Sequence, residues 1–178
     1  MMDHFLEEVA VKRNNTINRI LYALSWVVIV VSGLLAFIEL NGLLRSFSVP
    51  DLILALVFGG IAVYLYMTHD RILTEYEYTF TNGTLDFAEV YNNKKRKNLG
   101  SLNVKTVEAF GKVSSGSFHR YVSMPGLKKM NWFLNREAEL YYFFFSKDNN
   151  KKMIVFEPSA QMVSYIEQYL PKGAYQNN

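Results

Sequence analysis

Positively charged side chains are the residues of this chain most able to form a functional site. Four of them follow one another directly: Lys94, Lys95, Arg96 and Lys97. Each such cation is worth about 1 kcal/mol near an anionic surface, so the run predicts a contact with phosphate-bearing headgroups. The alternative is a solvated turn between two strands.

A second basic group lies between residues 112 and 136, a segment with five Lys and Arg and no acid. Aromatic side chains alternate with these cations, and long loops inside a compact domain are often functional. The residues that we expect to contact an anionic surface or a partner are Arg120, Lys128, Lys129 and Trp132. The alternative is that this segment folds over an open end of the domain as part of its core.

Residues suited to catalysis are few. His4, His69 and His119 lie far apart without a ligand-spaced partner, and the chain has no cysteine. No nucleophile elbow or glycine-rich phosphate loop is present. We therefore expect no catalytic residue, metal or cofactor, and a protein that is not an enzyme. The alternative hypothesis is an enzyme that binds or modifies a membrane lipid at the 112–136 loop, with His119 as acid or base.

Two long apolar runs lie on the N-terminal side of both basic groups in the sequence. Residues 20–38 and 52–68 contain no Asp, Glu, Lys or Arg. As helices they would reach roughly 28 and 26 Å, against about 30 Å for the hydrocarbon core of a bilayer. Together with the short connection between them, they predict a two-helix transmembrane hairpin over residues 17–69.

The charges that flank the hairpin predict its orientation. Lys12, Arg13 and Arg19 precede the first run and Arg71 follows the second, whereas the connecting loop carries only Arg45. The positive-inside rule then places both termini in the cytoplasm. The spans hold no ionisable residue, which argues against a transporter.

The segment before the hairpin, residues 1–16, is predicted to be a cytoplasmic amphipathic segment. Its apolar residues at 5, 6, 9 and 10 share one helical stripe, which is typical of a helix lying in the membrane interface. A frayed start that packs on the soluble domain explains the pattern equally well.

From residue 75 the apolar period changes from that of a helix to that of a strand. Tyr76, Tyr78 and Phe80 alternate with polar residues, and the Asn82-Gly83 dipeptide predicts a tight hairpin. Further strands are expected over residues 99–104 and 106–110, followed by an irregular segment over 111–136.

The last part of the chain predicts two strands and a helix. Residues 140–145 are continuously apolar and should form a strand buried on both faces, and residues 153–156 return beside it. A helix opens at Pro158 or Ser159. We place a mainly β domain over residues 70–172 and a disordered tail over 173–178.

The order of these elements resembles a pleckstrin-homology-like (PH-like) domain, an antiparallel barrel capped by a C-terminal helix. The segment Leu73–Phe87, with the basic run after it, is similar to bacterial membrane-anchored PH-like proteins of an uncharacterised family with two transmembrane helices. The resemblance implies a fold and a location in the cell membrane, and no activity.

Taken together, the sequence favours a non-catalytic binding or scaffold module at the cytoplasmic membrane surface. Its expected partners are the lipid bilayer itself and either anionic lipid headgroups or a protein, and not nucleic acid. A homodimer formed through Gly33 or through Gly59 and Gly60 is a further hypothesis.

Overall fold

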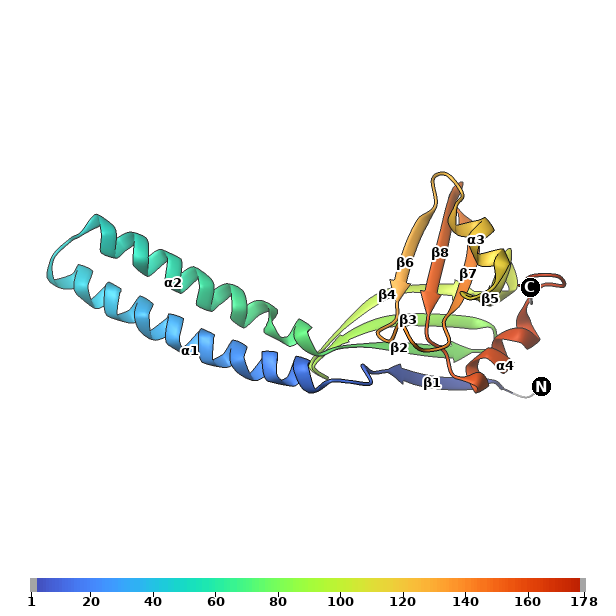
Figure 1. The fold of residues 1–178 in the computed structure, drawn as a ribbon, viewed down its shortest axis with the longest axis horizontal. Coiled ribbons are helices and arrows are strands. Elements are labelled where there is room, and N and C mark those ends of the chain that lie inside the picture. The colour runs from blue at the N-terminus through green and yellow to red at the C-terminus, as the bar shows by residue number, and fades with distance from the viewer. Residues whose placement is uncertain (1–2, 177–178) are drawn as a thin grey trace. The chain divides into compact units, whose positions relative to one another are not determined.

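The computed structural model describes residues 3–176, which divide into two compact units (Figure 1). The helical unit holds residues 14–74 and 91–94. The β unit holds the rest of the described chain, on both sides of the helical segment in the sequence. Each unit is described separately below.

Two long helices, α1 (Thr16–Arg45) and α2 (Val49–Thr68), form a hairpin that ends in a 3-10 helix, η1 (His69–Leu73). Both predicted spans are therefore confirmed as helices. Small side chains lie between them, because a Cβ built on Gly59 would lie 3.9 Å from the Cβ of Ala36. The other buried residues of the two helices are small too: Ser25, Ser32 and Ala55. Such residues let helix backbones approach closely.

The outward surfaces of α1 and α2 are apolar and exposed within the helical unit. Large side chains such as Leu34, Phe37 and Leu56 are 58–68% exposed. Only 17% of the most apolar stretch of α1 is buried, and only 6% of the corresponding stretch of the second helix. A helix in the core of a soluble protein would bury most of such a stretch. By length and composition, both helices are able to cross a membrane.

The β unit contains two sheets. The first has the order β1-β2-β3-β4, with β1 (Phe5–Ala10), β2 (Thr74–Thr81), β3 (Thr84–Tyr91) and β4 (Lys95–Asn103). The second has the order β6-β8-β7-β5-β9, with β5 (Ala109–Lys112), β6 (Lys128–Trp132), β7 (Tyr141–Lys147), β8 (Asn150–Phe156) and β9 (Tyr175–Gln176). The connections contain η2 (Val104–Thr106), α3 (Gly116–Val122) and α4 (Ala160–Tyr169).

The expected closed antiparallel barrel is wrong, although the mainly β architecture and the C-terminal helix are confirmed. Within residues 3–176, no strand of the second sheet pairs with β1 or β4, the two margins of the first sheet. The pairing is also not wholly antiparallel, since β6 runs parallel to β8 and β9 parallel to β5. The first sheet therefore keeps two free edges.

The amphipathic helix expected before the hairpin is also wrong, because residues 5–10 form strand β1. The strand pairs antiparallel with β2, with Leu6 opposite Phe80 and Ala10 opposite Tyr76. Leu6 and Ala10 turn toward the core while Phe5 stays exposed. The spacing of the apolar residues suggested a helical stripe because it was judged from neighbouring residues alone. Pairing with β2, far along the chain, makes this segment a strand, in which alternate side chains face the core.

The segment expected to be irregular, residues 111–136, contains α3 and β6. The basic run is mostly strand rather than turn, because β4 begins at Lys95. Tyr175 and Gln176, placed in the disordered tail, form β9. The ends of the predicted terminal segments, residues 1–2 and 177–178, lie outside the described residues.

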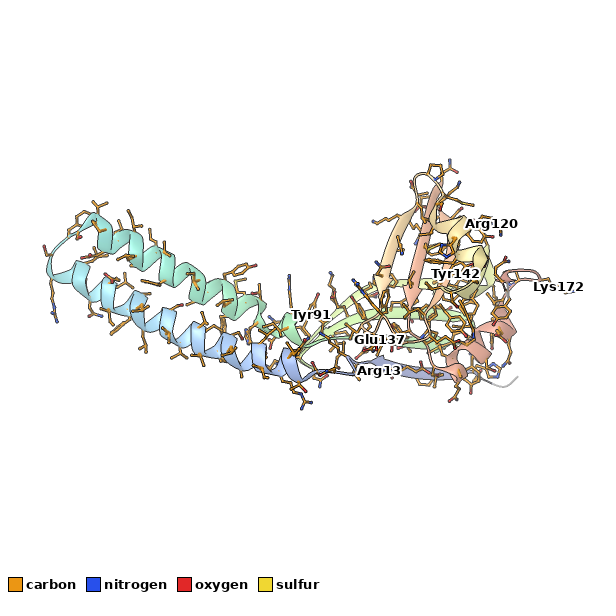
Figure 2. All side chains as sticks on the ribbon, viewed as in Figure 1. Arg13, Tyr91, Arg120, Glu137, Tyr142 and Lys172 are labelled. Atoms are coloured by element: carbon orange, nitrogen blue, oxygen red, sulfur yellow. The ribbon has the colours of Figure 1, made fainter. Side chains whose placement is uncertain are left out.

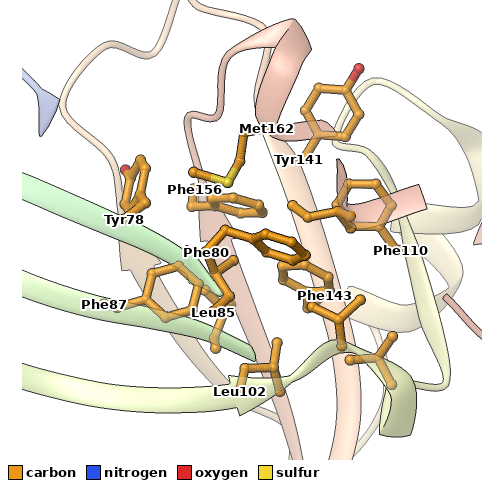
Figure 3. Packing of buried hydrophobic residues seen from close by; sticks show 14 of the residues in the cluster. Tyr78, Phe80, Leu85, Phe87, Leu102, Phe110, Tyr141, Phe143, Phe156 and Met162 are labelled. Atoms are coloured by element: carbon orange, nitrogen blue, oxygen red, sulfur yellow. The ribbon is translucent and has the colours of Figure 1, made fainter. Parts of the chain in front are cut away.

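The predictions for residues 140–170 are largely confirmed. Strand β7 is buried on both faces, since Phe143 lies in one apolar cluster and Phe144 in another. The first cluster lies between the two sheets (Figure 3) and the second lies under α3. Helix α4 begins after Ser159, whose hydroxyl accepts a hydrogen bond from the N–H of Met162 at 3.1 Å.

The turn between β2 and β3 gives a stability test. Gly83 has φ +94°, and an added Cβ would lie 2.6 Å from the ring of Tyr169, whereas Gly126 has φ +74° and open space. We expect Gly126→Ala to cost about 1 kcal/mol of backbone strain. Gly83→Ala should cost the same backbone strain and a further 1–3 kcal/mol, roughly, of folding free energy because the new methyl group is overpacked against Tyr169. Thermal unfolding of the full chain in detergent measures both, and equal losses would contradict close packing of Tyr169 on the turn.

Candidate functional site

The four cations of the basic run are largely engaged with neighbouring acids. Arg96 Nε lies 2.8 Å from a carboxylate oxygen of Glu77, and Lys97 Nζ lies 3.7 Å from Glu89. In the helical unit, the Asp70 carboxylate accepts a hydrogen bond from Lys94 and raises the pKa of that lysine above its ordinary value. The structure therefore uses most of this run to hold β4 and its preceding turn.

Arg120 and Trp132 contact other side chains rather than an open site. The Arg120 guanidinium lies 4.8 Å from the centre of the Tyr121 ring. Trp132 is half-buried in the first apolar cluster, with its ring 4.7 Å from that of Phe87. Trp132 thus packs against the buried residues of that cluster.

Lys128 and Lys129 belong to a larger basic group that the sequence analysis missed. Because β6 pairs in parallel with β8, Lys128 lies beside Lys152. Figure 1 shows the start of β6 next to the turn between β7 and β8, at the tip of the second sheet. We call this group the basic tip, and its members are Lys128, Lys129, Lys147, Lys151 and Lys152.

Lysines outnumber acids at the basic tip, where Asp148 is the acid in the turn between β7 and β8. Adjacent strands are about 4.8 Å apart, and like charges directly across them destabilise a sheet. Among residues 3–176, none of the five lysines forms an ion pair, although Lys129 lies over the ring of Phe118. An anionic group at the tip would relieve the repulsion between Lys128 and Lys152.

A vesicle assay tests the tip. We expect the full chain, held in neutral nanodiscs, to float with anionic vesicles and not with neutral ones. The double substitution Lys128→Glu with Lys152→Glu should reduce that binding at least fivefold, and added salt should weaken it because exposed charges are screened.

The matched control for the vesicle assay changes two exposed lysines outside the tip, Lys105→Glu with Lys172→Glu, and alters the net charge equally. An equal loss of vesicle binding in this control would contradict a local anion site. Equal binding to anionic and neutral vesicles would contradict it too.

A polar cluster occupies the end of the helical hairpin, where α2 and η1 meet residues 91–94. The side-chain amide of Asn92 donates hydrogen bonds to Asp70 at 2.8 Å and to the Tyr22 hydroxyl at 3.1 Å. The N–H of Asn92 donates to the carbonyl of Leu73 at 2.8 Å. This Asp70 cluster, comprising Tyr22, His69, Asp70, Asn92 and Lys94, holds residues 91–94 against the end of the hairpin within the helical unit.

His69 is buried beside Asp70 and is surrounded by aromatic rings. Its Nδ1 faces the carbonyl oxygen of Tyr66 at 2.8 Å and therefore carries a proton. Its Nε2 lies 3.5 Å from an Asp70 oxygen. The rings around it are those of Tyr22, Trp26 and Tyr66, at 4.9–5.9 Å between centres. These contacts make His69 a packing residue of the hairpin end.

Asn92 offers a test of this cluster. Asn92→Gly keeps the positive φ accessible and removes both side-chain hydrogen bonds. We expect a loss of about 1–3 kcal/mol, because a buried carboxylate loses a donor. Faster tryptic cleavage near Lys94 should report the freed turn.

Asn93→Gly is the control for the Asn92 substitution. Asn93 has φ +54° and forms no side-chain hydrogen bond among the described residues, so its replacement should leave the cleavage rate unchanged. Equal cleavage of both variants would contradict the anchoring role of Asn92.

A groove of about 770 Å³ lies in the β unit, between the end of β1, residues 135–139 and the start of α4. Asn135 holds one wall, since its amide donates to Glu157 at 2.9 Å and to the Val11 carbonyl at 2.9 Å. Its side-chain oxygen accepts from the N–H of Arg13, also at 2.9 Å.

The three histidines have different surroundings within their units. His4 stacks on Tyr165 in the β unit, His69 lies in the helical unit, and His119 is exposed on α3, outside the groove. Over the described residues, no group of three His, Asp or Glu side chains is arranged to hold a metal ion.

Comparison with known proteins assigns a family. The family described as Bacterial PH-like domain (DUF6106) matches residues 2–176, nearly the whole chain. No curated protein and no solved structure matches the chain. The resemblance to an uncharacterised PH-like family is therefore confirmed, and the chain belongs to the family of bacterial PH-like domains DUF6106.

Proposed function

We propose that this protein is a membrane-anchored, non-catalytic binding module whose PH-like domain works at the cytoplasmic membrane surface. The observation that carries the proposal is the exposed apolar surface of α1 and α2 within the helical unit. Thirty and twenty residues long, these helices suffice to cross a bilayer. Their large side chains stay exposed in the chain by itself, which is what lipid contact requires.

The ends of the hairpin support the orientation with the β unit in the cytoplasm. The basic residues Lys12, Arg13 and Arg19 lie on the side of the hairpin that continues into the strands. Tyr64 and Tyr66 are exposed in the last turns of α2 on that same side. Aromatic side chains of this kind favour the membrane–water interface.

A binding role has more support than catalysis. The 112–136 segment, which the enzyme hypothesis would use, places Phe118 and Trp132 in apolar clusters. Its histidine, His119, is exposed and has no carboxylate within ion-pair distance among residues 3–176. The basic tip and the groove beside β1 instead present surfaces to a charged or extended partner.

Two measurements on the full chain test the anchor and its orientation. We expect the protein to remain in the membrane pellet after alkaline carbonate extraction. Since the chain has no cysteine, single Ser46→Cys and Ser164→Cys variants can be labelled specifically. Ser46 follows α1 and Ser164 lies exposed on α4.

A membrane-impermeant maleimide should label the position-46 variant in intact cells and the position-164 variant only after permeabilisation. The reverse pattern would invert the topology. Release of the protein by carbonate would refute the anchor itself.

A further inference from the structure

In the described part of the β unit, large exposed hydrophobic side chains lie only on the first strand and on the residue after it. Among the described residues of this unit, the large hydrophobic side chains that stay exposed are Phe5, Val9 and Val11, at 61%, 48% and 49%. All other exposed large hydrophobics belong to the helical unit. A concentration of this kind on one sheet margin marks an interaction surface.

The backbone of β1 also has an unused edge. The N–H of Asn82 donates to the carbonyl of His4, so the alternation of an antiparallel ladder turns Leu6, Glu8 and Ala10 toward β2. The backbone groups of Phe5, Glu7 and Val9 then point away from the sheet. Figure 1 shows β1 at the margin of its sheet, with no strand beyond it.

The side chain of Asn135 forms hydrogen bonds with the backbone on this side of the chain. Beyond β1, the same edge continues at Val11 and Arg13, and the Asn135 side chain bonds to the carbonyl of the first and the N–H of the second. An amide thus already pairs with the edge where β1 ends. Among residues 3–176, no strand pairs with the edge from Phe5 to Val9, and the groove adjoins the Val9 end of that edge.

We propose that β1 binds an extended peptide segment of another protein by strand addition, and that this segment carries a basic residue between two apolar ones. Added strands obtain affinity from backbone hydrogen bonds and specificity from alternate side chains. On the exposed face the partner would meet Phe5, Glu7 and Val9 in turn, so an apolar–basic–apolar alternation is complementary. Its intervening side chains would point to the groove, on the face of Glu8 and Ala10.

Charge disfavours a second copy of this chain as the occupant. An antiparallel pair of β1 strands that sets Phe5 against Val9 also sets Glu7 against the Glu7 of the other copy. Glu7 is exposed and has no ion pair within residues 3–176, so it remains available for a basic partner residue. The inference rests on the proposed binding role and specifies its partner.

The test uses full-length protein in neutral nanodiscs and two fluorescent capped peptides, Thr-Val-Thr-Arg-Thr-Val-Thr and the same peptide with Glu in place of Arg. Fluorescence anisotropy should show that the wild type prefers the Arg peptide. Glu7→Lys should weaken that binding at least tenfold and shift the preference to the Glu peptide. Glu108→Lys makes the same charge change at an exposed position outside the groove and should leave binding unchanged.

A backbone variant separates strand addition from surface charge. Val9→Pro removes an N–H that faces away from β2, so it should abolish binding of both peptides while β1 stays paired. Absence of Arg-peptide binding would overturn the proposal, and so would binding that is unchanged in both the Val9→Pro and the Glu7→Lys variant.

A concentration-dependent dimer abolished by Val9→Pro would overturn it in favour of self-pairing. Carbonate extraction and cysteine labelling do not depend on peptide binding. They therefore test the membrane anchor separately from strand addition at β1.

Discussion

The two sheets of the β unit pack on a shared apolar cluster, and within it one buried hydroxyl forms hydrogen bonds from the first sheet to the ends of β6 and β8. The side chain of Tyr78 is fully buried on β2, where its hydroxyl donates to the carbonyl of Trp132 and accepts from the N–H of Glu157 at 3.4 Å. Burial raises the pKa of Tyr78, so the hydroxyl keeps the proton that it donates. Trp132 ends β6 and Glu157 follows β8, so both strands are fixed against the first sheet at this point. Strand β1 is joined instead to the start of α4, because the Glu8 carboxylate accepts hydrogen bonds from the N–H and the hydroxyl of Ser159, and both residues line the groove.

The parts of the fold that could be predicted from sequence are those encoded by neighbouring residues. Absence of charge over residues 20–38 and 52–68 is enough to specify two long helices. The Asn82-Gly83 turn and the apolar run of β7 depend on spacings of a few residues. Helix α4 was recognisable from a proline, a capping serine and an apolar stripe, all within fifteen residues.

What the sequence did not disclose depends on residues far apart in the chain. Strand β1 needs β2, about seventy residues later, before period two outweighs the helical spacing of its apolar residues. The basic tip exists because a parallel register sets Lys128 beside Lys152, and no local pattern encodes register between strands twenty residues apart. Asp70 gave only a weak signal, a carboxylate at the end of an apolar run, and its partner Asn92 follows after a complete hairpin.

The order of segments has a consequence for biogenesis. Strand β1 leaves the ribosome before both helices, whereas its neighbour β2 leaves after them. Asn18 and Ile72, joined by a hydrogen bond of 2.9 Å, bring the two ends of the helical segment together. The hairpin thus closes a loop of about sixty residues, whose entropy would otherwise oppose the pairing of β1 with β2. Helix assembly should therefore precede completion of the sheet, and a fragment beginning at residue 70 would expose the edge of β2 that β1 normally covers.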